Sequence, residues 1–223
     1  QAFNQNFFHL NTNPTLLHNA SIMGTPVGVA QDASGHIIVI TSQGRIVSLS
    51  VLGVQLATQN FPAGIVPRSV SMNSAGDIYV LATNGTMFHL NTGLTILHTV
   101  ALPMGAGSPV DIAAATTGEV YVATSAKVFK RSGILAALSE ADFTGATAIT
   151  ANNTGDIFLT TTVNVQRLNT SLTSLASGTV AGTPIDVACD NSGNTIVAAS
   201  GSRLYRISNA IAVLGSITLS GTL

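Results

Sequence analysis

The strongest constraint on the fold is a phrase that recurs along the chain: a short polar turn that ends in glycine, followed by a run of β-branched or aromatic residues. Its clearest copy runs from Asn73 to Val80. The turn glycines are spaced 41, 42, 37 and 38 residues apart, by subtraction of their numbers, and are Gly35, Gly76, Gly118, Gly155 and Gly193. Repetition at such a period indicates one structural unit that is stacked on itself.

Each repeat divides into four short segments that read as strands. The first follows a proline in four of the five repeats, where the missing N–H is not needed. The second follows the glycine turn, because glycine permits the positive φ of a tight hairpin. A period of roughly 40 residues with short strands and without helical periodicity is typical of propeller blades. We therefore predict an all-β fold, a β-propeller of four-stranded blades that forms a single domain over residues 1–223.

The start of the chain matches only the second half of a repeat. Phe8 to His18 resembles Phe88 to His98, which predicts an outer half blade over residues 1–23. Full blades are then expected at about 24–64, 65–106, 107–145, 146–181 and 182–223, giving six blade positions. If the chain continues for about 20 residues, half of the repeat period, it would complete the sixth blade. If it stops at Leu223, a partner chain or a five-bladed closure must cover the open edge.

Composition excludes some classes of function and favours a location. Charged residues make up 8% of the chain and the net charge is -1, so there is no basic field for nucleic acid or anionic lipid. Apolar runs are strand-length and fall far short of the roughly 18 residues that a membrane helix needs. A surface built from Ser, Thr, Asn and Gln suits a secreted or cell-surface protein. The first residue is Gln1 and not Met, which indicates a processed product or an excerpt of a longer chain, and a mature N-terminus after signal removal is the simpler interpretation.

Four triplets fit the acceptor pattern for N-glycosylation, at Asn19, Asn84, Asn152 and Asn169. They favour a glycoprotein, although a chain rich in Asn and Thr also produces such triplets by chance. The single cysteine, Cys189, can form no internal disulfide, and at a strand end we expect a buried, inert thiol.

The repeat pattern resembles a known family. Pro109 to Val122 reads Pro-x-Asp-Ile-Ala, a polar turn, Gly-Glu-Val-Tyr-Val, and similar segments cover essentially the whole chain. This pattern resembles NHL-type propeller repeats and their relatives, the six-bladed lactonase and lyase propellers. The resemblance implies the fold more than a function, because the matching residues form hairpins and blade cores. NHL repeats usually carry an Asp and an Asn-x-[Arg/Lys] loop where this chain has Ile40 to Arg45, so an RNA-binding role is not implied.

Candidate binding residues lie on the first strands, which border the channel of a propeller. Asp111 and Asp186 occupy the same position in blades two apart. They could bind Ca²⁺ or a polar ligand at the channel mouth, or they could bond backbone amides or channel water. A lactonase-like metal site would also need a Glu and an Asn on inner positions, and the Glu is missing. Arg68 could pair with Asp111 or hold an anion, with a structural ion pair as the alternative reading.

The histidines pair at matching repeat positions, His9 with His18 and His89 with His98, so inheritance of the repeat explains them without a metal. No metalloprotease helix, nucleophile elbow, phosphate loop or cysteine cluster is present. We therefore expect a non-enzymatic binding or structural module without a cofactor, which recognises protein or glycan or associates with itself through an open blade edge. The alternative is a metal-dependent enzyme of the lactonase or lyase kind, with Asp111 and Asp186 at its axial site.

Overall fold

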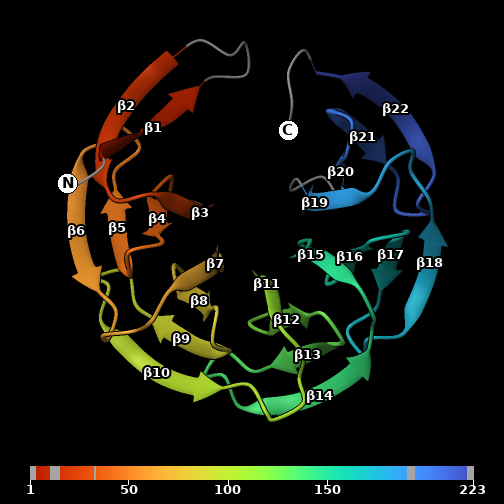
Figure 1. Cartoon of the computed structure of the whole chain (residues 1–223), viewed down its shortest axis with the longest axis horizontal. Coiled ribbons are helices and arrows are strands. Elements are labelled where there is room, and N and C mark those ends of the chain that lie inside the picture. Colours follow the sequence, from red (N-terminus) through yellow and green to blue (C-terminus); the bar gives the residue numbers. More distant parts are fainter. Residues whose placement is uncertain (1–3, 11–15, 33, 190–193, 220–223) are drawn as a thin grey trace. The chain divides into compact units, whose positions relative to one another are not determined.

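The computed structural model describes residues 4–10, 16–32, 34–189 and 194–219, and all regular elements in these ranges are strands. The chain divides into two units, Gln1–Leu102 and Pro103–Leu223. Unit 1 contains a two-stranded sheet, formed by β1 (Asn4–Leu10) and β2 (Leu16–Met23), and two four-stranded sheets (Figure 1). Unit 2 contains three four-stranded sheets. We call the four-stranded sheets blades 1 to 5 in chain order.

The blades of unit 1 have the following strands. Blade 1 consists of β3 (Pro26–Gln31), β4 (Ile37–Thr41), β5 (Arg45–Leu49) and β6 (Gln55–Asn60), and blade 2 of β7 (Pro67–Met72), β8 (Ile78–Ala82), β9 (Thr86–Leu90) and β10 (Ile96–Ala101). In unit 2, blade 3 consists of β11 (Pro109–Ala114), β12 (Val120–Thr124), β13 (Lys127–Arg131) and β14 (Ala137–Asp142). Blade 4 consists of β15 (Ala146–Ala151), β16 (Ile157–Thr161), β17 (Val165–Leu168) and β18 (Ser174–Gly178), and blade 5 of β19 (Pro184–Cys189), β20 (Thr195–Ala199), β21 (Arg203–Ile207) and β22 (Val213–Thr218).

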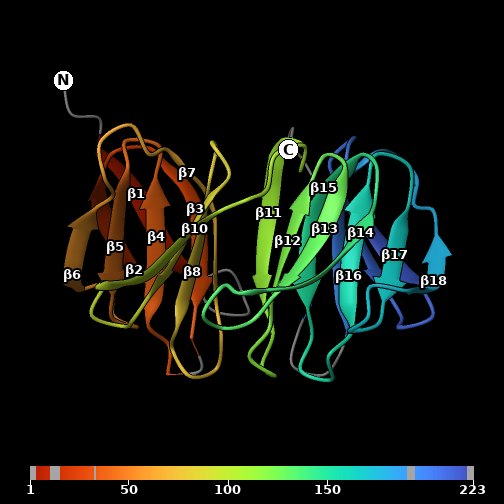
Figure 2. The ribbon, with the colours of Figure 1, turned by 90° about the horizontal axis from the view of Figure 1, so that it is seen from below.

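Each blade is an antiparallel sheet whose strands lie side by side in chain order, as Figure 2 shows for β11 to β14. The recurring sequence phrase forms the hairpin between the first and second strands. In blade 2 the side-chain oxygen of Asn73 accepts the N–H groups of Ala75 and Asp77, at 3.0 and 2.9 Å. Gly76 has a φ of 89°, a conformation that a residue without Cβ adopts readily. The sequence prediction of four strands per repeat is therefore confirmed.

The second strands form the centre of the blades. Every residue of β4, β8, β12 and β16 is buried, as expected for a sheet that is covered on both faces. The alternating sequence of the third strands predicts one exposed side, but in β5 and β9 only the first residue is partly exposed. The polar residues Ser48 and His89 are buried there: Ser48 lines a pocket between blades 1 and 2, and His89 contacts Asp77 and His98.

The turn between the third and fourth strands is anchored by an apolar residue in a left-handed conformation. Such a backbone costs about 1–2 kcal/mol for a residue with a side chain. Burial of a leucine side chain contributes about 1.5–3 kcal/mol, which offsets that cost. The anchors have φ between 59° and 65° and are buried; they are Leu94, Leu135, Leu172 and Ile211. Blade 1 has Gly53 at this place instead, with a φ of 73°.

Within each unit, consecutive blades pack face to face. We call the face toward the following blade the forward face and the opposite one the backward face. Because successive side chains of a strand point to opposite faces, Phe158 of β16 packs forward onto blade 5 while Ile157 packs backward onto blade 3. The matching cluster in unit 1 joins Ile38 of blade 1 to Val80 of blade 2. The cores of the molecule are these interfaces between blades.

The two-stranded sheet precedes blade 1 in the chain and contacts it. Ile22 of β2 packs with Ile37, Val39, Val47 and Leu49 on the backward face of blade 1. Strands are thus present where the sequence predicts the outer half of a blade. The predicted turn at Gly193 and the segment Ser220 to Leu223 lie outside the described residues. Within the ranges given above, the chain forms no helix that could span a membrane.

Candidate functional site

An acidic residue and a basic residue meet at one end of successive blades. The acidic residue follows the hairpin glycine, and the basic residue comes from the third strand. The pairs are Asp77 with His89 (3.2 Å), Glu119 with Lys130 (3.2 Å) and Asp156 with Arg167 (3.0 Å). Burial would raise the pKa of Asp77, but hydrogen bonds from Asn73 and His89 lower it below its usual value. The repeat therefore fills this end of blades 2, 3 and 4 with paired polar groups.

Blade 1 departs from this rule at both positions. His36 follows the hairpin glycine, and Ser48 stands where the other third strands carry the basic residue. Ser48 lies opposite Ile38 in the strand register, just as Lys130 lies opposite Tyr121. A serine side chain is far shorter than that of lysine or arginine. The position is buried, with Ser48 4% exposed, and the short side chain leaves space between blades 1 and 2.

Asp32 holds His36 in place. One carboxylate oxygen accepts the N–H groups of Ser34 and His36, at 2.9 and 2.8 Å, and the other lies 2.9 Å from Nδ1 of the His36 ring. The Asp32 side chain is 6% exposed and that of His36 is 46% exposed. Burial would raise the pKa of Asp32, but the hydrogen bonds from His36 and Ser34 lower it. An ionised carboxylate can only accept, so Nδ1 carries the proton and Nε2 is left for another partner.

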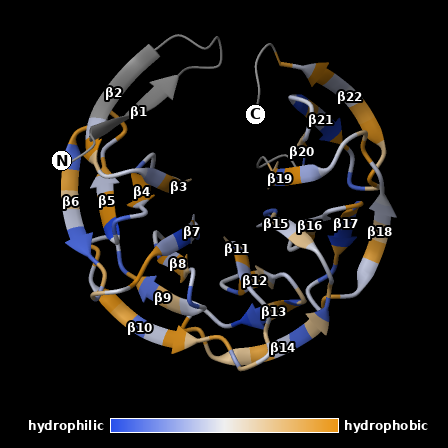
Figure 3. Cartoon of the chain, in the orientation of Figure 1, coloured by the Kyte–Doolittle hydropathy of each residue, from blue (hydrophilic) through white to orange (hydrophobic). Residues whose placement is uncertain are grey.

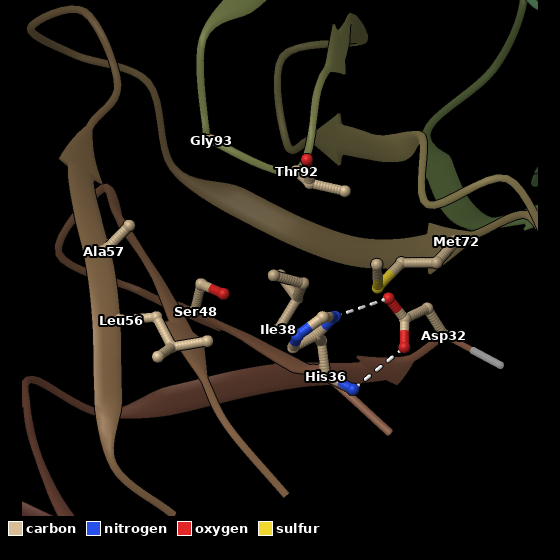
Figure 4. Close-up of a pocket in the computed structure, with 9 residues that line it drawn as sticks. All are labelled: Asp32, His36, Ile38, Ser48, Leu56, Ala57, Met72, Thr92 and Gly93. Atoms are coloured by element: carbon tan, nitrogen blue, oxygen red, sulfur yellow. Dashed lines mark hydrogen bonds and ion pairs between the residues drawn. The ribbon is translucent and has the colours of Figure 1, made fainter. Parts of the chain in front are cut away.

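These groups line one wall of a pocket of about 350 Å³. Figure 4 shows the His36 ring turned toward Asp32 through one nitrogen, with Ser48 and Leu56 on its other side. Blade 2 supplies the opposite wall through Met72 and the turn residues Thr92 and Gly93, and the full lining is Asp32, His36, Ile38, Ser48, Leu56, Ala57, Met72, Thr92 and Gly93. Its polar lining residues are Asp32, His36, Ser48 and Thr92, and the other side chains of the lining are apolar.

The predicted axial residue Asp111 links two neighbouring strands. Its Oδ1 accepts the N–H of Ile112 at 2.8 Å, and its Oδ2 accepts the N–H of Ile149 on β15 at 2.9 Å. Both oxygens are therefore engaged by backbone amides, which is one of the two readings that the sequence left open. Ca²⁺ binding at Asp111 would compete with the bond that ties blade 3 to blade 4.

Asp186 repeats only half of this arrangement. Its Oδ1 accepts the N–H of Val187 at 2.8 Å, while Oδ2 has no hydrogen bond within the described residues. Asp186 is exposed at the first strand of blade 5. Asp111 and Asp186 thus take the same position in two blades, as predicted, but only Asp111 contacts a following blade.

Within the described part of unit 2, no blade follows blade 5 to cover its forward face. Ile196 is 40% exposed, whereas its counterparts Ile38, Tyr121 and Phe158 are at most 1% exposed. A second hollow of about 350 Å³ lies on this face, lined by Ile196, Leu204, Tyr205, Arg206, Gly215, Ser216 and Ile217. Apolar residues colour parts of β22 orange in Figure 3, and Ile217 on this strand is 59% exposed. An uncovered apolar surface of this kind is typical of an interaction site.

Arg68 and the predicted histidine pair lie on strands. Arg68 is an exposed residue of β7 where the register with β8 shifts, between Pro67 and Ser69. Its expected partner Asp111 belongs to the other unit, and that pairing stays a prediction. Nδ1 of His89 lies 3.1 Å from Nδ1 of His98, and no group of three or more possible metal ligands occurs among the described residues.

The predicted glycosylation sites differ in accessibility. Asn84 is exposed and Asn169 is half-buried. Asn152 is only 3% exposed, and its side chain bonds to Thr154 and Asp156 within the hairpin turn. The side chain of Asn19 lies outside the described part of the chain. Cys189 ends β19 as expected but is half-buried, with its sulfur 3.3 Å from the Thr195 hydroxyl.

Sequence reasoning missed the pocket between blades 1 and 2. The signal was present, because aligned repeats place Ser48 at the position of His89, Lys130 and Arg167. One residue of each pair comes from the hairpin and the other from the third strand, so only the strand register reveals that they meet.

No protein-family model and no curated protein matches the chain. Several solved structures are similar to the chain. A streptogramin B lyase is 14% identical with a TM-score of 0.76, over 98% of this chain and 74% of that one. Virginiamycin B lyase from Staphylococcus aureus is 11% identical with a TM-score of 0.74, over 99% of this chain and 75% of that one. A Bacteroides caccae protein of unknown function is 16% identical with a TM-score of 0.64, over 82% and 72%. At these identities the likeness concerns the fold alone, and that fold is the β-propeller.

Proposed function

We propose that this chain is a protein-interaction module, and that the forward face of blade 5 receives a β-sheet from a protein partner. The observation that carries the proposal is the exposure of Ile196, which is 40% exposed while Tyr121 and Phe158 at the same position of blades 3 and 4 are 1% and 0% exposed. In those blades the following blade covers the side chain. The open face therefore continues a series of interfaces that the repeat already makes.

The carboxylate of Asp186 indicates which group a partner would contribute to this surface. In blade 3 the equivalent carboxylate of Asp111 accepts an N–H of the next blade's first strand, at 2.9 Å. Oδ2 of Asp186, which has no hydrogen bond within the described residues, is suited to the same bond, because a carboxylate stabilises a backbone N–H that would otherwise be buried without a partner. A partner strand with a free N–H next to Asp186, and aliphatic side chains facing Ile196 and Leu204, fits this surface.

The same proposal assigns β1 and β2 to the outer half of a sixth blade, on the match between Phe8 to His18 and Phe88 to His98. The repeat itself builds faces that complement a forward face, as the contact of Val197 in blade 5 with Phe158 in blade 4 illustrates. A second copy of the chain is therefore the first partner to test.

The low charge and the accessible sequons support a further part of the proposal, a secreted or cell-surface location. Asn84 is the site best placed for a glycan, whereas Asn152 would have to leave its hydrogen bonds first. Enzymatic deglycosylation of the native protein followed by intact-mass measurement checks this expectation. A mass unchanged by the enzyme would remove the glycoprotein assignment.

The alternative of a lactonase-like or lyase-like enzyme at Asp111 and Asp186 has the fold of known lyases in its favour. It has less support from the residues, because both oxygens of Asp111 already accept backbone N–H groups. Titration with Ca²⁺ tests it: a saturable change of the Asp111 and Asp186 carboxyl resonances, lost on chelation, would favour the enzyme.

Sedimentation velocity over a range of concentrations tests the interaction module. We expect concentration-dependent association of the wild-type chain, and loss of that association in the Ile196→Asp variant, because a charge at the centre of the face must be desolvated. Val163→Asp is the matched control, since Val163 is 70% exposed in a turn of blade 4 and its variant should associate normally. A wild-type chain that stays monomeric at millimolar concentration, or equal loss in both variants, would overturn the proposal.

A further inference from the structure

We propose that the pocket between blades 1 and 2 is a binding site for a small alcohol or phenol, a neutral molecule with a compact apolar body and one hydroxyl group. The site lies in unit 1 and does not depend on the interaction surface of blade 5.

The pocket results from a local change in the repeat. Where blade 1 has Ser48, blade 3 has Lys130, whose side chain is 16% exposed and reaches Glu119 at 3.2 Å. Refilling the position in blade 1 would need one longer side chain. An unfilled hollow forgoes packing contacts and lowers the free energy of unfolding. A ligand that occupies the hollow would restore those contacts, and about 350 Å³ lies in the range of pockets for small molecules.

The side chains of the pocket walls determine which kind of ligand fits. Ile38, Leu56, Ala57 and Met72 surround most of the space with aliphatic groups and one thioether (Figure 4). The lining contains no phenylalanine, tyrosine or tryptophan ring on which a sugar could stack and no lysine or arginine that could hold an anion. The ionised carboxylate of Asp32 further disfavours negatively charged ligands. A small, neutral and largely apolar molecule fits these walls best.

The polar end selects a hydroxyl. The Nδ1 proton of His36 faces Asp32, so in the neutral form of the ring Nε2 presents a lone pair that can accept from a ligand O–H. The Ser48 hydroxyl makes no hydrogen bond within the described residues and can donate to the same ligand oxygen. One hydroxyl placed between the two side chains would satisfy both, and an ether in its place could not donate to His36.

Asp32, His36 and Ser48 are the residue types of a serine hydrolase triad. Asp32 bonds to His36, but no hydrogen bond joins His36 to Ser48 in the described ranges. The geometry therefore favours binding without acyl transfer, and a fluorophosphonate probe distinguishes the two. Labelling of Ser48 by this probe would overturn the assignment as a binding site.

The four methionines supply a direct readout. With ¹³C-methyl methionine, we expect p-cresol to shift the Met72 signal saturably, because Met72 lines the pocket. Met104, which is fully exposed, reports non-specific contact, and Met87, which is fully buried, reports that the fold is intact. The matched ligand 4-methylanisole has the same body without the donor, and loss of one hydrogen bond predicts binding roughly three- to tenfold weaker.

Two variants complete the experiment. Ser48→Leu should abolish the Met72 shift by filling the pocket, whereas Ser174→Leu at an exposed position of β18 should leave it unchanged. If Ser48→Leu fails to fold, His36→Phe serves in its place and should remove the preference for p-cresol over 4-methylanisole. The proposal is wrong if Met72 does not respond to millimolar p-cresol, if Met104 shifts to the same extent, or if the two ligands bind equally to the wild-type chain.

Discussion

Two interfaces between blades differ although their strands pair in the same way. They are the interface between blades 1 and 2 and the interface between blades 3 and 4. At the second, Lys130 reaches Glu119 and the polar end of the interface is filled. At the first, Ser48 and His36 stand at the same two positions and leave a pocket of about 350 Å³. In both blades the residue from the third strand lies opposite the second residue of the second strand, Ser48 opposite Ile38 and Lys130 opposite Tyr121. Side-chain length and charge at two positions therefore decide whether a blade interface is solid or hollow.

A second contrast concerns the same forward face in covered and uncovered blades. Phe158 in blade 4 is 0% exposed and Ile196 in blade 5 is 40% exposed, although each is the second residue of the second strand of its blade. The stability of a blade therefore depends on its neighbour as much as on its own strands, as in other repeat proteins. Substitutions on these faces measure how strongly each interface contributes.

The largest effect is expected for Phe158→Ala. This substitution removes a fully buried ring from the cluster between blades 4 and 5, which predicts a loss of about 3–5 kcal/mol in the free energy of unfolding. Ile196→Ala at the open face should cost no more than about 1.5 kcal/mol, because less apolar area leaves a buried environment. Urea unfolding of both variants, followed by circular dichroism, makes the comparison. Equal losses would contradict the view that the blade 5 face is uncovered.

The fold was predictable because each repeat carries recognisable hairpin residues in its sequence. The glycine turn, the proline before most first strands and the spacing of the repeats locate the strands to within about two residues, as β8 and β19 illustrate. The environment of the third strands was not predictable from alternation alone. Ser48 and His89 look like solvent-facing residues in sequence, but they are buried by contacts from another blade or another strand.

The next largest effect is expected when the residue pair of blade 3 is introduced into blade 1. The double variant His36→Glu with Ser48→Lys rebuilds in blade 1 the pair of Glu119 and Lys130. We expect the pocket to close and p-cresol affinity to fall at least tenfold. The free energy of unfolding should change by less than about 1 kcal/mol, because a partly exposed ion pair contributes little. Methionine NMR and urea unfolding check the two expectations.

The control is the reverse substitution, in which blade 3 receives the residues of blade 1. Glu119→His with Lys130→Ser should leave binding at Met72 unchanged, because the altered interface belongs to the other unit. Binding that survives in the blade 1 double variant would show that the pocket does not hold the ligand.

The candidate site could be predicted only in part. Asp111 and Asp186 were found at equivalent positions, and the structure adds that one of them bridges to Ile149. The pocket residues were missed because Asp32 and His36 read as ordinary turn residues and Ser48 as a polar strand residue. Their meeting depends on strand register and on the turn of blade 2, which contributes Thr92. A pocket that results from one short side chain, such as that of Ser48, is hard to recognise in a single sequence.

The smallest expected effect is a shift in acid stability at the hollow interface. The folded pKa of Asp32 is lowered by its hydrogen bonds, so its contribution to stability is present above the unfolded pKa and is lost as pH falls through the folded value. His36→Phe removes two of the causes that lower the pKa, the side-chain bond and the charge interaction, while burial still raises it. The carboxyl signal of Asp32 should therefore titrate at higher pH in this variant, and the stabilising contribution should be lost earlier on acidification. Asp77 in blade 2 is the internal reference, because its pKa is lowered by Asn73 and His89 instead. NMR titration of both carboxyl groups decides: an unchanged Asp32 curve would mean that His36 does not control the charge at the polar end of the pocket.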